Sequence, residues 1–178
     1  MRSFAGALGF VVLSVAATAN ADVQRYTAGV MCEGLYQNWQ YMYREERGIA
    51  NFSTTSLQGV VCPARSRDVA IGNQCFGGTY TMSVDYDDET NTDDFWCEAY
   101  KVTFTGTMSW TAPRYTCSAG ACPDPTEVNM GTGTMTLPSL QTSCVDGTFQ
   151  NFGAICNLPR RVTPGTSFVL KVTAQTPS

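Results

Sequence analysis

The chain has 178 residues, of which 43% are apolar, so it is long enough to build one domain around a hydrophobic core. It has 15 Asp and Glu residues against 11 Lys and Arg, and this formal charge of −4 argues against binding to nucleic acid or to an anionic membrane surface. Histidine is absent, which excludes histidine-based triads, Cys–His pairs and metal sites that need imidazole. Composition alone does not identify a biochemical activity.

The N-terminus, residues 1–21, has the pattern of a secretory signal peptide. Arg2 precedes an apolar run over residues 4–17, and the small-residue tripeptide Ala19-Asn20-Ala21 follows. We expect cleavage after Ala21, because the run is short for a membrane span and no stop-transfer charges follow it. No later segment approaches the roughly twenty apolar residues of a membrane helix, so we expect a secreted or periplasmic protein with no membrane span after cleavage.

The first predicted strand after the cleavage site covers residues 35–43 and is rich in aromatic side chains. Tyr36, Trp39 and Tyr41 lie among glutamine and asparagine residues there. Rings of this kind can stack on sugars while the amides hydrogen-bond sugar hydroxyls, so these three are candidate ligand-binding residues for a glycan. Because Trp39, Tyr41 and Tyr43 alternate, the commoner alternative is that they point into the core and anchor it.

Strand-type alternation recurs through the rest of the chain. It is clearest in residues 80–86, 96–104 and 168–174, where we expect the even-numbered side chains to share an apolar face. The weaker strand candidates are residues 57–62, 130–137 and 148–156. Stretches rich in Gly, Pro, Asp and Asn separate these segments and favour turns. Seven or eight short strands with this spacing predict an all-β, antiparallel β-sandwich, in one domain over residues 22–178.

An acidic stretch lies between the predicted strands 80–86 and 96–104. Its carboxylates include Asp85, Asp87, Asp88, Glu89, Asp93 and Asp94. Calcium prefers six to eight hard oxygen ligands, which an acidic hairpin loop can supply, so these residues are candidate metal ligands and calcium is the candidate cofactor. The spacing is not that of an EF-hand. The alternative is a solvated hairpin tip that prevents edge-to-edge association.

Glu98 raises the question of a carboxylate-based hydrolase, because glycoside hydrolysis needs two carboxylates and no histidine. It shares its predicted strand face with Trp96 and Tyr100, where burial would raise its pKa. The commoner alternative is an ion pair with Arg44 or Arg114. The domain is also small for a cleft with substrate subsites, and we assign no catalytic residue.

Two further patterns are weaker. Thr-x-Thr runs occur at residues 79–81, 103–107 and 132–136, as in some ice-binding surfaces, but their period is not constant and threonine commonly faces solvent in strands. Asn51-Phe52-Ser53 fits the acceptor pattern for N-glycosylation, which matters only in a eukaryotic host. Neither pattern favours a function.

Eight cysteines follow the predicted cleavage site. They are Cys32, Cys62, Cys75, Cys97, Cys117, Cys122, Cys144 and Cys156. An even number in an exported chain predicts four disulfides, and metal binding is less favoured because the sequence has neither a C-x-x-C pair nor histidine. Eight cysteines allow 105 pairings, and the sequence alone does not choose among them. Only Ser-Ala-Gly-Ala separates Cys117 from Cys122, which favours one local disulfide.

Four segments resemble a group of exported proteins. They are Gly29-Val-Met-Cys32, Ser53 to Pro63 with its Val-Val-Cys-Pro end, Phe95-Trp-Cys97, and Gly153-Ala-Ile-Cys-Asn-Leu-Pro159. Through them, residues 28–174 are similar to small exported disulfide-containing proteins of unknown function found in myxobacterial and related genomes. The resemblance implies an exported β-sandwich from a Gram-negative bacterium, and it implies no activity.

The resemblance also guides the cysteine pairing. Four cysteines are additions to the pattern of the group and are therefore paired among themselves, as Cys117–Cys122 and Cys75–Cys144. For the other four we prefer Cys32–Cys62 and Cys97–Cys156. The sequence thus predicts a secreted or periplasmic protein of unknown biochemical role, a non-enzymatic surface or binding protein. It does not identify the partner, for which a glycan or a cell-surface molecule is the candidate. The alternatives are a carbohydrate- or calcium-dependent adhesion module and a small carboxylate-based hydrolase.

Overall fold

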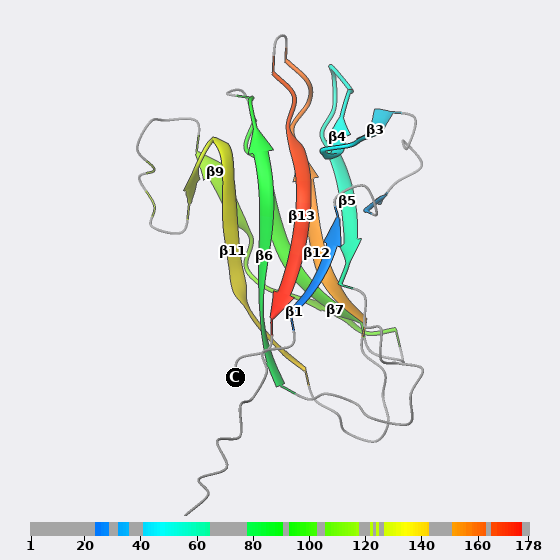
Figure 1. Cartoon of the computed structure of the whole chain (residues 1–178), viewed down its shortest axis with the longest axis vertical. Coiled ribbons are helices and arrows are strands. Elements are labelled where there is room, and N and C mark those ends of the chain that lie inside the picture. The colour runs from blue at the N-terminus through cyan, green and yellow to red at the C-terminus, as the bar shows by residue number, and fades with distance from the viewer. Residues whose placement is uncertain are drawn as a thin grey trace, which may run out of the picture.

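Figure 1 shows the fold of the chain in a computed structural model. The structure describes residues 24–28, 32–35, 41–64, 78–90, 93–102, 106–117, 122, 124, 127–142, 151–162 and 165–175. The predicted signal peptide, Cys75 and Cys144 lie outside these residues. Among the described residues, no helix has the length and apolar character needed to cross a membrane.

The described strands form two β-sheets, called sheet I and sheet II below. Sheet I has the order β11 (Gly131–Thr142), β6 (Gly78–Asp88), β13 (Phe168–Gln175), β4 (Gly48–Asn51) and β3 (Met42–Glu45), with β1 (Gln24–Ala28) paired to β13. Sheet II has the order β10 (Val128–Asn129), β9 (Arg114–Cys117), β7 (Trp96–Val102), β12 (Asn151–Leu158), β5 (Gln58–Pro63) and β2 (Glu33–Gly34), with β8 (Met108–Trp110) paired to β7. Strands β9 and β10 are parallel, and the other described pairs are antiparallel.

The two sheets pack face to face, as β6 and β13 over β7 and β12 in Figure 1 show. The core between them contains side chains from both sheets. Two aromatic pairs cross it: the ring centroids of Tyr80 and Phe152 are 4.6 Å apart, and those of Tyr86 and Phe95 are 5.4 Å apart. The predicted all-β sandwich is therefore confirmed.

Strands β6 and β7 show where the alternation pattern was reliable. In β6 the predicted face is confirmed, because Tyr80, Met82, Val84 and Tyr86 are buried between half-buried neighbours. In β7 the predicted face is wrong: the odd-numbered Cys97 and Ala99 are fully buried, whereas Trp96 and Glu98 are half-buried on the outer face. Small side chains face the core here because large rings and the disulfide of Cys97 fill it.

Strand β13 departs from simple alternation. The register against β6 shifts between Val169 and Lys171, which marks a bulge or irregularity. Val169, Val172 and Ala174 therefore reach the core, and Leu170 is only half-buried, contrary to the predicted even-numbered face. In the described part of the chain the two sheets contain six and seven strands, more than the seven or eight predicted in total. Pieces as short as β2 and β10 are too short to show an alternating pattern in the sequence.

Of the predicted aromatic strand 35–43, the structure describes residues 35 and 41–43, and only Met42 and Tyr43 of these belong to a strand. Strand β3 begins at Met42 and forms a hairpin with β4, and Tyr36 and Trp39 lie outside the described residues. Tyr41 and Tyr43 are 42% and 59% exposed, so the interpretation of these two as core anchors is wrong. Met42, between them, packs against the core, so alternation along the chain turns its two tyrosine neighbours towards solvent.

Three of the predicted disulfides are confirmed: Cys32–Cys62, Cys97–Cys156 and Cys117–Cys122. Cys97 and Cys156 are directly opposite each other on β7 and β12, and Cys32 immediately precedes β2, the strand paired with the β5 of Cys62. These four residues are fully buried. Both of these disulfides therefore link neighbouring parts of sheet II. The predicted fourth pair lies outside the described residues.

The acceptor pattern at Asn51 has a structural role. Asn51 ends β4 and is fully buried, and its Nδ2 donates hydrogen bonds to the carbonyl oxygens of Ser56, Leu158 and Pro159 at 2.9, 3.2 and 2.9 Å. Its Oδ1 accepts from the backbone N–H of Ser53 at 2.8 Å. The side chain thus joins sheet I to the end of β12 in sheet II. Its amide nitrogen is not available for a glycan in the folded protein.

Candidate functional site

The outer face of sheet II carries a row of side chains that crosses four strands. Trp96 on β7 is opposite Tyr115 on β9 and Asn157 on β12, and Asn157 is opposite Gly59 on β5. Directly opposed residues point to the same face of a sheet, so these side chains share one surface. Gly59, at the end of the row, has no side chain to cover the outer face of β5. A hollow results beside Trp96.

This hollow, here called the tryptophan groove, has a volume of about 490 Å³. Trp96 and Trp110 line it on the side of β7 and β8, and Leu35 and Leu57 line it on the side of β2 and β5. Its floor comprises Gly59, Ile155, Cys156 and Asn157, and Glu98 also lines it. The groove thus combines chain segments that are far apart in the sequence.

The aromatic side chains of the groove are accessible to a ligand. Trp110 is 62% exposed, and Leu35 and Leu57 are exposed as well. The Trp96 ring is half-buried and lies 6.4 Å from the ring of Tyr115, measured between centroids. Large exposed apolar side chains gathered at one hollow are typical of a binding surface rather than of ordinary solvent-facing sheet.

Glu98 is the charged group of the groove. It is opposite Ile155, between the levels of Trp96 and Tyr100 on β7. Desolvation by burial raises the pKa of Glu98, as the sequence predicted. The predicted ion pair with arginine is not found: none of the ion pairs within the described part of the chain includes Glu98, and Arg44 instead donates to the carbonyl oxygen of Cys32. No cation among the described residues therefore neutralises this carboxylate.

The groove does not supply the second carboxylate of a glycosidase. Of its described lining residues, only Glu98 has a carboxylate. Glu33 lies in the same cross-strand row, but three strand spacings separate it from Glu98, which is about 14 Å. Glycoside hydrolysis uses roughly 5 to 10 Å. The described lining of the groove therefore lacks the carboxylate pair of a glycoside hydrolase.

The predicted acidic hairpin loop is in large part a strand. Asp85 and Asp87 belong to β6 and lie on the outer face of sheet I. Asp85 accepts a 2.7 Å hydrogen bond from the hydroxyl of Thr134 and forms an ion pair with Lys171 at 3.4 Å. Asp87 accepts a 3.1 Å hydrogen bond from Thr132. Both carboxylates are thus occupied by neighbouring strands.

Asp88 points the opposite way, into the molecule. It is buried, and its carboxylate accepts hydrogen bonds from the hydroxyls of Thr116 and Ser167 at 2.6 Å each and from that of Thr90 at 3.0 Å. Because Thr116 lies on β9, these bonds tie sheet I to sheet II. Asp88 therefore stabilises the sandwich.

The remaining acidic residues do not complete a calcium site either. Glu89 accepts from the backbone N–H of Thr166 at 3.4 Å, Asp93 pairs with Arg160 at 2.9 Å, and Asp94 is exposed. Among the described residues, the group of three acidic or cysteine side chains close enough to hold one ion is a different one: Cys117, Cys122 and Glu127. Among the described residues, strand alternation separates the carboxylates of the acidic stretch, so these carboxylates do not gather at one point. Calcium binding by this stretch stays a prediction.

The sequence identified part of the groove and missed the rest. Trp96 and Glu98 were placed on one face, and they do share it, although that face is the outer one. Trp110 was missed because its strand has three residues, too few for a visible period. The candidate ligand-binding residue Tyr41 is exposed but does not line the groove. Of the other two, Tyr36 and Trp39, the structure describes neither.

No protein-family model matches the chain, and no curated protein matches it. Among solved structures, the fold is similar to that of a protein described as "xylan-binding module CBM15", with a TM-score of 0.44 and 11% sequence identity. The match covers 86% of this chain and 90% of that chain.

Proposed function

We propose that this protein is an exported, non-enzymatic binding protein that holds a saccharide in the tryptophan groove. The observation that carries the proposal is a groove with two tryptophan rings around a partly desolvated carboxylate that has no cation partner among the described residues. Flat rings offer stacking surfaces to sugar rings, and a carboxylate accepts hydrogen bonds from hydroxyls. The three disulfides that the structure describes support export into an oxidising compartment, as does the resemblance to exported myxobacterial proteins.

The spacing of the aromatic residues favours a chain of sugars rather than a single one. Trp110 is opposite Tyr100, four residues along β7 from Trp96. The levels of the two tryptophans are therefore about 13 Å apart along the strand direction, with Glu98 between them. An oligosaccharide lying along β7 would stack at both ends and meet the carboxylate between them. Asn157, opposite Trp96, adds an amide for hydrogen bonds to hydroxyls.

The experiment is a binding assay with defined polysaccharide probes. Wild type, Trp110→Ala, Glu98→Gln and the control Tyr43→Ala are compared by affinity electrophoresis in gels containing cellulose derivatives, β-glucan, mannan or chitosan, and by pull-down on chitin and peptidoglycan. Tyr43 is the matched control because it is an equally exposed aromatic outside the groove.

We expect at least one probe to retard the wild type, and its Kd to rise about 10-fold or more in Trp110→Ala, since one stacked ring contributes about 1–2 kcal/mol. The Kd of Tyr43→Ala should stay within about twofold of wild type. Binding should also survive a calcium chelator, because Asp85 and Asp93 already have cation partners. Retardation that is equal in wild type and Trp110→Ala, or absent with every probe, overturns the proposal.

A further inference from the structure

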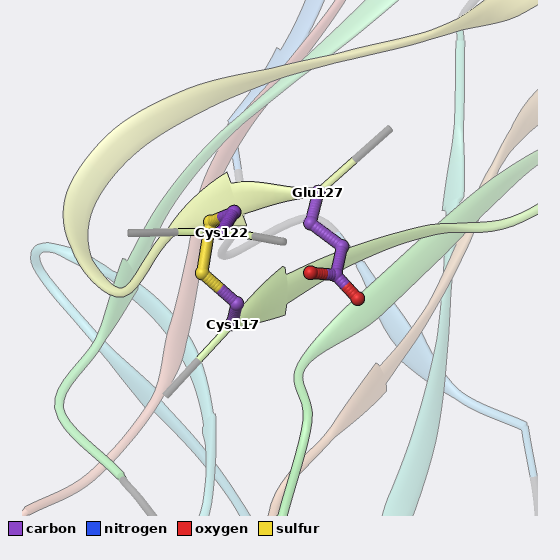
Figure 2. A group of neighbouring side chains, drawn as sticks. All are labelled: Cys117, Cys122 and Glu127. Carbon is purple, nitrogen blue, oxygen red and sulfur yellow. A yellow bond between two sulfur atoms is a disulfide. The ribbon is translucent and has the colours of Figure 1, made fainter. Parts of the chain in front are cut away.

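A second chemical cluster lies at the other edge of sheet II, where β9 and β10 run parallel. Figure 2 shows the Cys117–Cys122 disulfide with the side chain of Glu127 beside it. Each sulfur and one carboxylate oxygen of Glu127 lie within 4.8 Å of one another. Two sulfurs and a carboxylate at such distances are the donor types that zinc prefers, once the sulfurs are thiolates.

Glu127 lacks a partner for one of its oxygen atoms. Its Oε2 is buried and has no hydrogen-bond donor among the described residues. A buried carboxylate oxygen without a donor is costly, and native structures rarely keep one without a reason. A cation bound by the Glu127 carboxylate and the neighbouring sulfurs would compensate for the missing donor.

The Cys117–Cys122 disulfide is also the most accessible of the three that the structure describes. Cys122 is partly exposed and lines a hollow of about 670 Å³ together with Glu127 and Asn129. The four cysteines of the other two described disulfides are fully buried. Thiol–disulfide exchange requires direct approach to a sulfur atom, so a reductant reaches Cys122 first.

The surrounding fold does not depend on this bond for its position. Thr116 on β9 pairs with Val128 on β10, and the N–H of Met130 donates to the carbonyl oxygen of Cys117 at 3.3 Å. These contacts hold Cys117 and Glu127 next to each other whether or not the sulfurs are joined. Cys122 remains close because only four residues separate it from Cys117.

From these observations we propose that reduction of Cys117–Cys122 creates a zinc-binding site with Glu127 as the third ligand. A dithiol transfers two electrons and two protons to the disulfide, giving two cysteine thiols and an oxidised, cyclic disulfide of the reductant. Zn²⁺ then replaces the two thiol protons, which are released to solvent. The fourth position is taken by water or by Oδ1 of Asn129, which lies 3.4 Å from the sulfur of Cys122. Oxidation would release the metal.

The test titrates Zn²⁺ into the full chain by calorimetry, before and after mild reduction with a water-soluble phosphine. Co²⁺ serves as a spectroscopic probe, because thiolate ligands give it an intense near-ultraviolet charge-transfer band. Alkylation of free thiols followed by peptide mass spectrometry shows which disulfide has opened. The variants are Cys117→Ser with Cys122→Ser, Glu127→Gln, and the control Asp94→Asn, which removes an exposed carboxylate elsewhere.

We expect the reduced wild type to bind one Zn²⁺ and the oxidised form none, with alkylation at Cys117 and Cys122 while Cys97 and Cys156 stay protected. The double serine variant should lose binding, Glu127→Gln should weaken it about 10-fold or more, and Asp94→Asn should leave it unchanged. Equal binding in the oxidised form or in the double serine variant overturns the proposal. So does loss of β-sheet circular dichroism in the double serine variant, since the site then has no fold to hold it.

Discussion

Asn51→Asp is the sharpest single test of how the two sheets are joined. The two side chains have the same shape, and the new carboxylate keeps the hydrogen bond from the N–H of Ser53. It replaces the Nδ2 donor with an oxygen, however, and that oxygen faces the carbonyl oxygens of Ser56, Leu158 and Pro159. Only the protonated acid can donate to one of them.

The size of the effect follows from the hydrogen bonds lost. A net hydrogen bond stabilises by about 1 kcal/mol, so the protonated form of Asn51→Asp, which keeps one of the three donated bonds, should be less stable than wild type by about 2 kcal/mol. Burial beside carbonyl oxygens raises the folded-state pKa of the introduced carboxyl group above its unfolded value of about 3.9. The folded state then binds more protons than the unfolded state. Stability is therefore greatest below about pH 4 and falls by up to about 1.4 kcal/mol per pH unit until the folded pKa is reached.

Urea denaturation followed by tryptophan fluorescence at pH 4, 5, 6 and 7 measures this dependence. The control is Asn51→Ala, which loses the same contacts without adding a titrating group, so its difference from wild type should not change with pH. If the Asn51→Asp difference is flat between pH 4 and 7, or if this variant equals wild type at pH 7, the assignment of the amide as a donor between the sheets is wrong.

Three further substitutions probe the groove and its supports. Burial raises the pKa of Glu98 above its ordinary value of 4.5, so its contribution to stability is complete below that pH and is lost as the pH rises through the raised pKa. The melting temperature of Glu98→Gln should therefore rise relative to that of wild type between pH 4 and 7. A difference in melting temperature that stays constant over this range would contradict this. Gly153→Ala would place a Cβ against the carbonyl oxygen of Cys62 and 2.9 Å from Cε1 of Tyr100. Chemical denaturation should therefore show a loss of about 1–3 kcal/mol or more in the free energy of unfolding, and unchanged stability would refute the packing of this residue. Replacing both Cys97 and Cys156 by Ala removes a disulfide that spans 59 residues. The free energy of unfolding, measured in the same way, should fall by about 4 kcal/mol, because the unfolded chain is no longer restrained. A loss below about 1 kcal/mol would mean that this disulfide does not restrain the unfolded chain.

How well the sequence predicted each strand depended on how different the two faces of that strand are. Strand β6 has large apolar side chains on one face and threonine, serine and aspartate on the other, so its pattern has one solution. Strand β7 has Trp96 on its outer face and Cys97 and Ala99 on its inner face. The prediction placed the face with the larger apolar residue, Trp96, in the core. The choice depends on how much room the opposing sheet leaves, which no local pattern contains.

The groove illustrates the same limit at the level of the site. Glu98 stood out in the sequence because a carboxylate among aromatic residues is unusual. The other lining residues did not stand out, because only the strand order β8, β7, β12, β5 and β2 in sheet II brings them close to Glu98. They are Leu35, Leu57, Trp110 and Asn157. Strand order is a long-range property, and without it a set of residues this dispersed cannot be recognised as one surface.

The pairing of β1 with β13 has a mechanical consequence. Gln24 is opposite Gln175, so tension applied at these two positions would open the pair like a zipper, one hydrogen bond at a time and at low force. The buried disulfides would then limit the further extension: the Cys97–Cys156 link alone shields 59 residues, or about 200 Å of contour length, from the load. Under pulling, sheet I would yield first, and the cross-linked sheet that carries the tryptophan groove would keep its shape the longest.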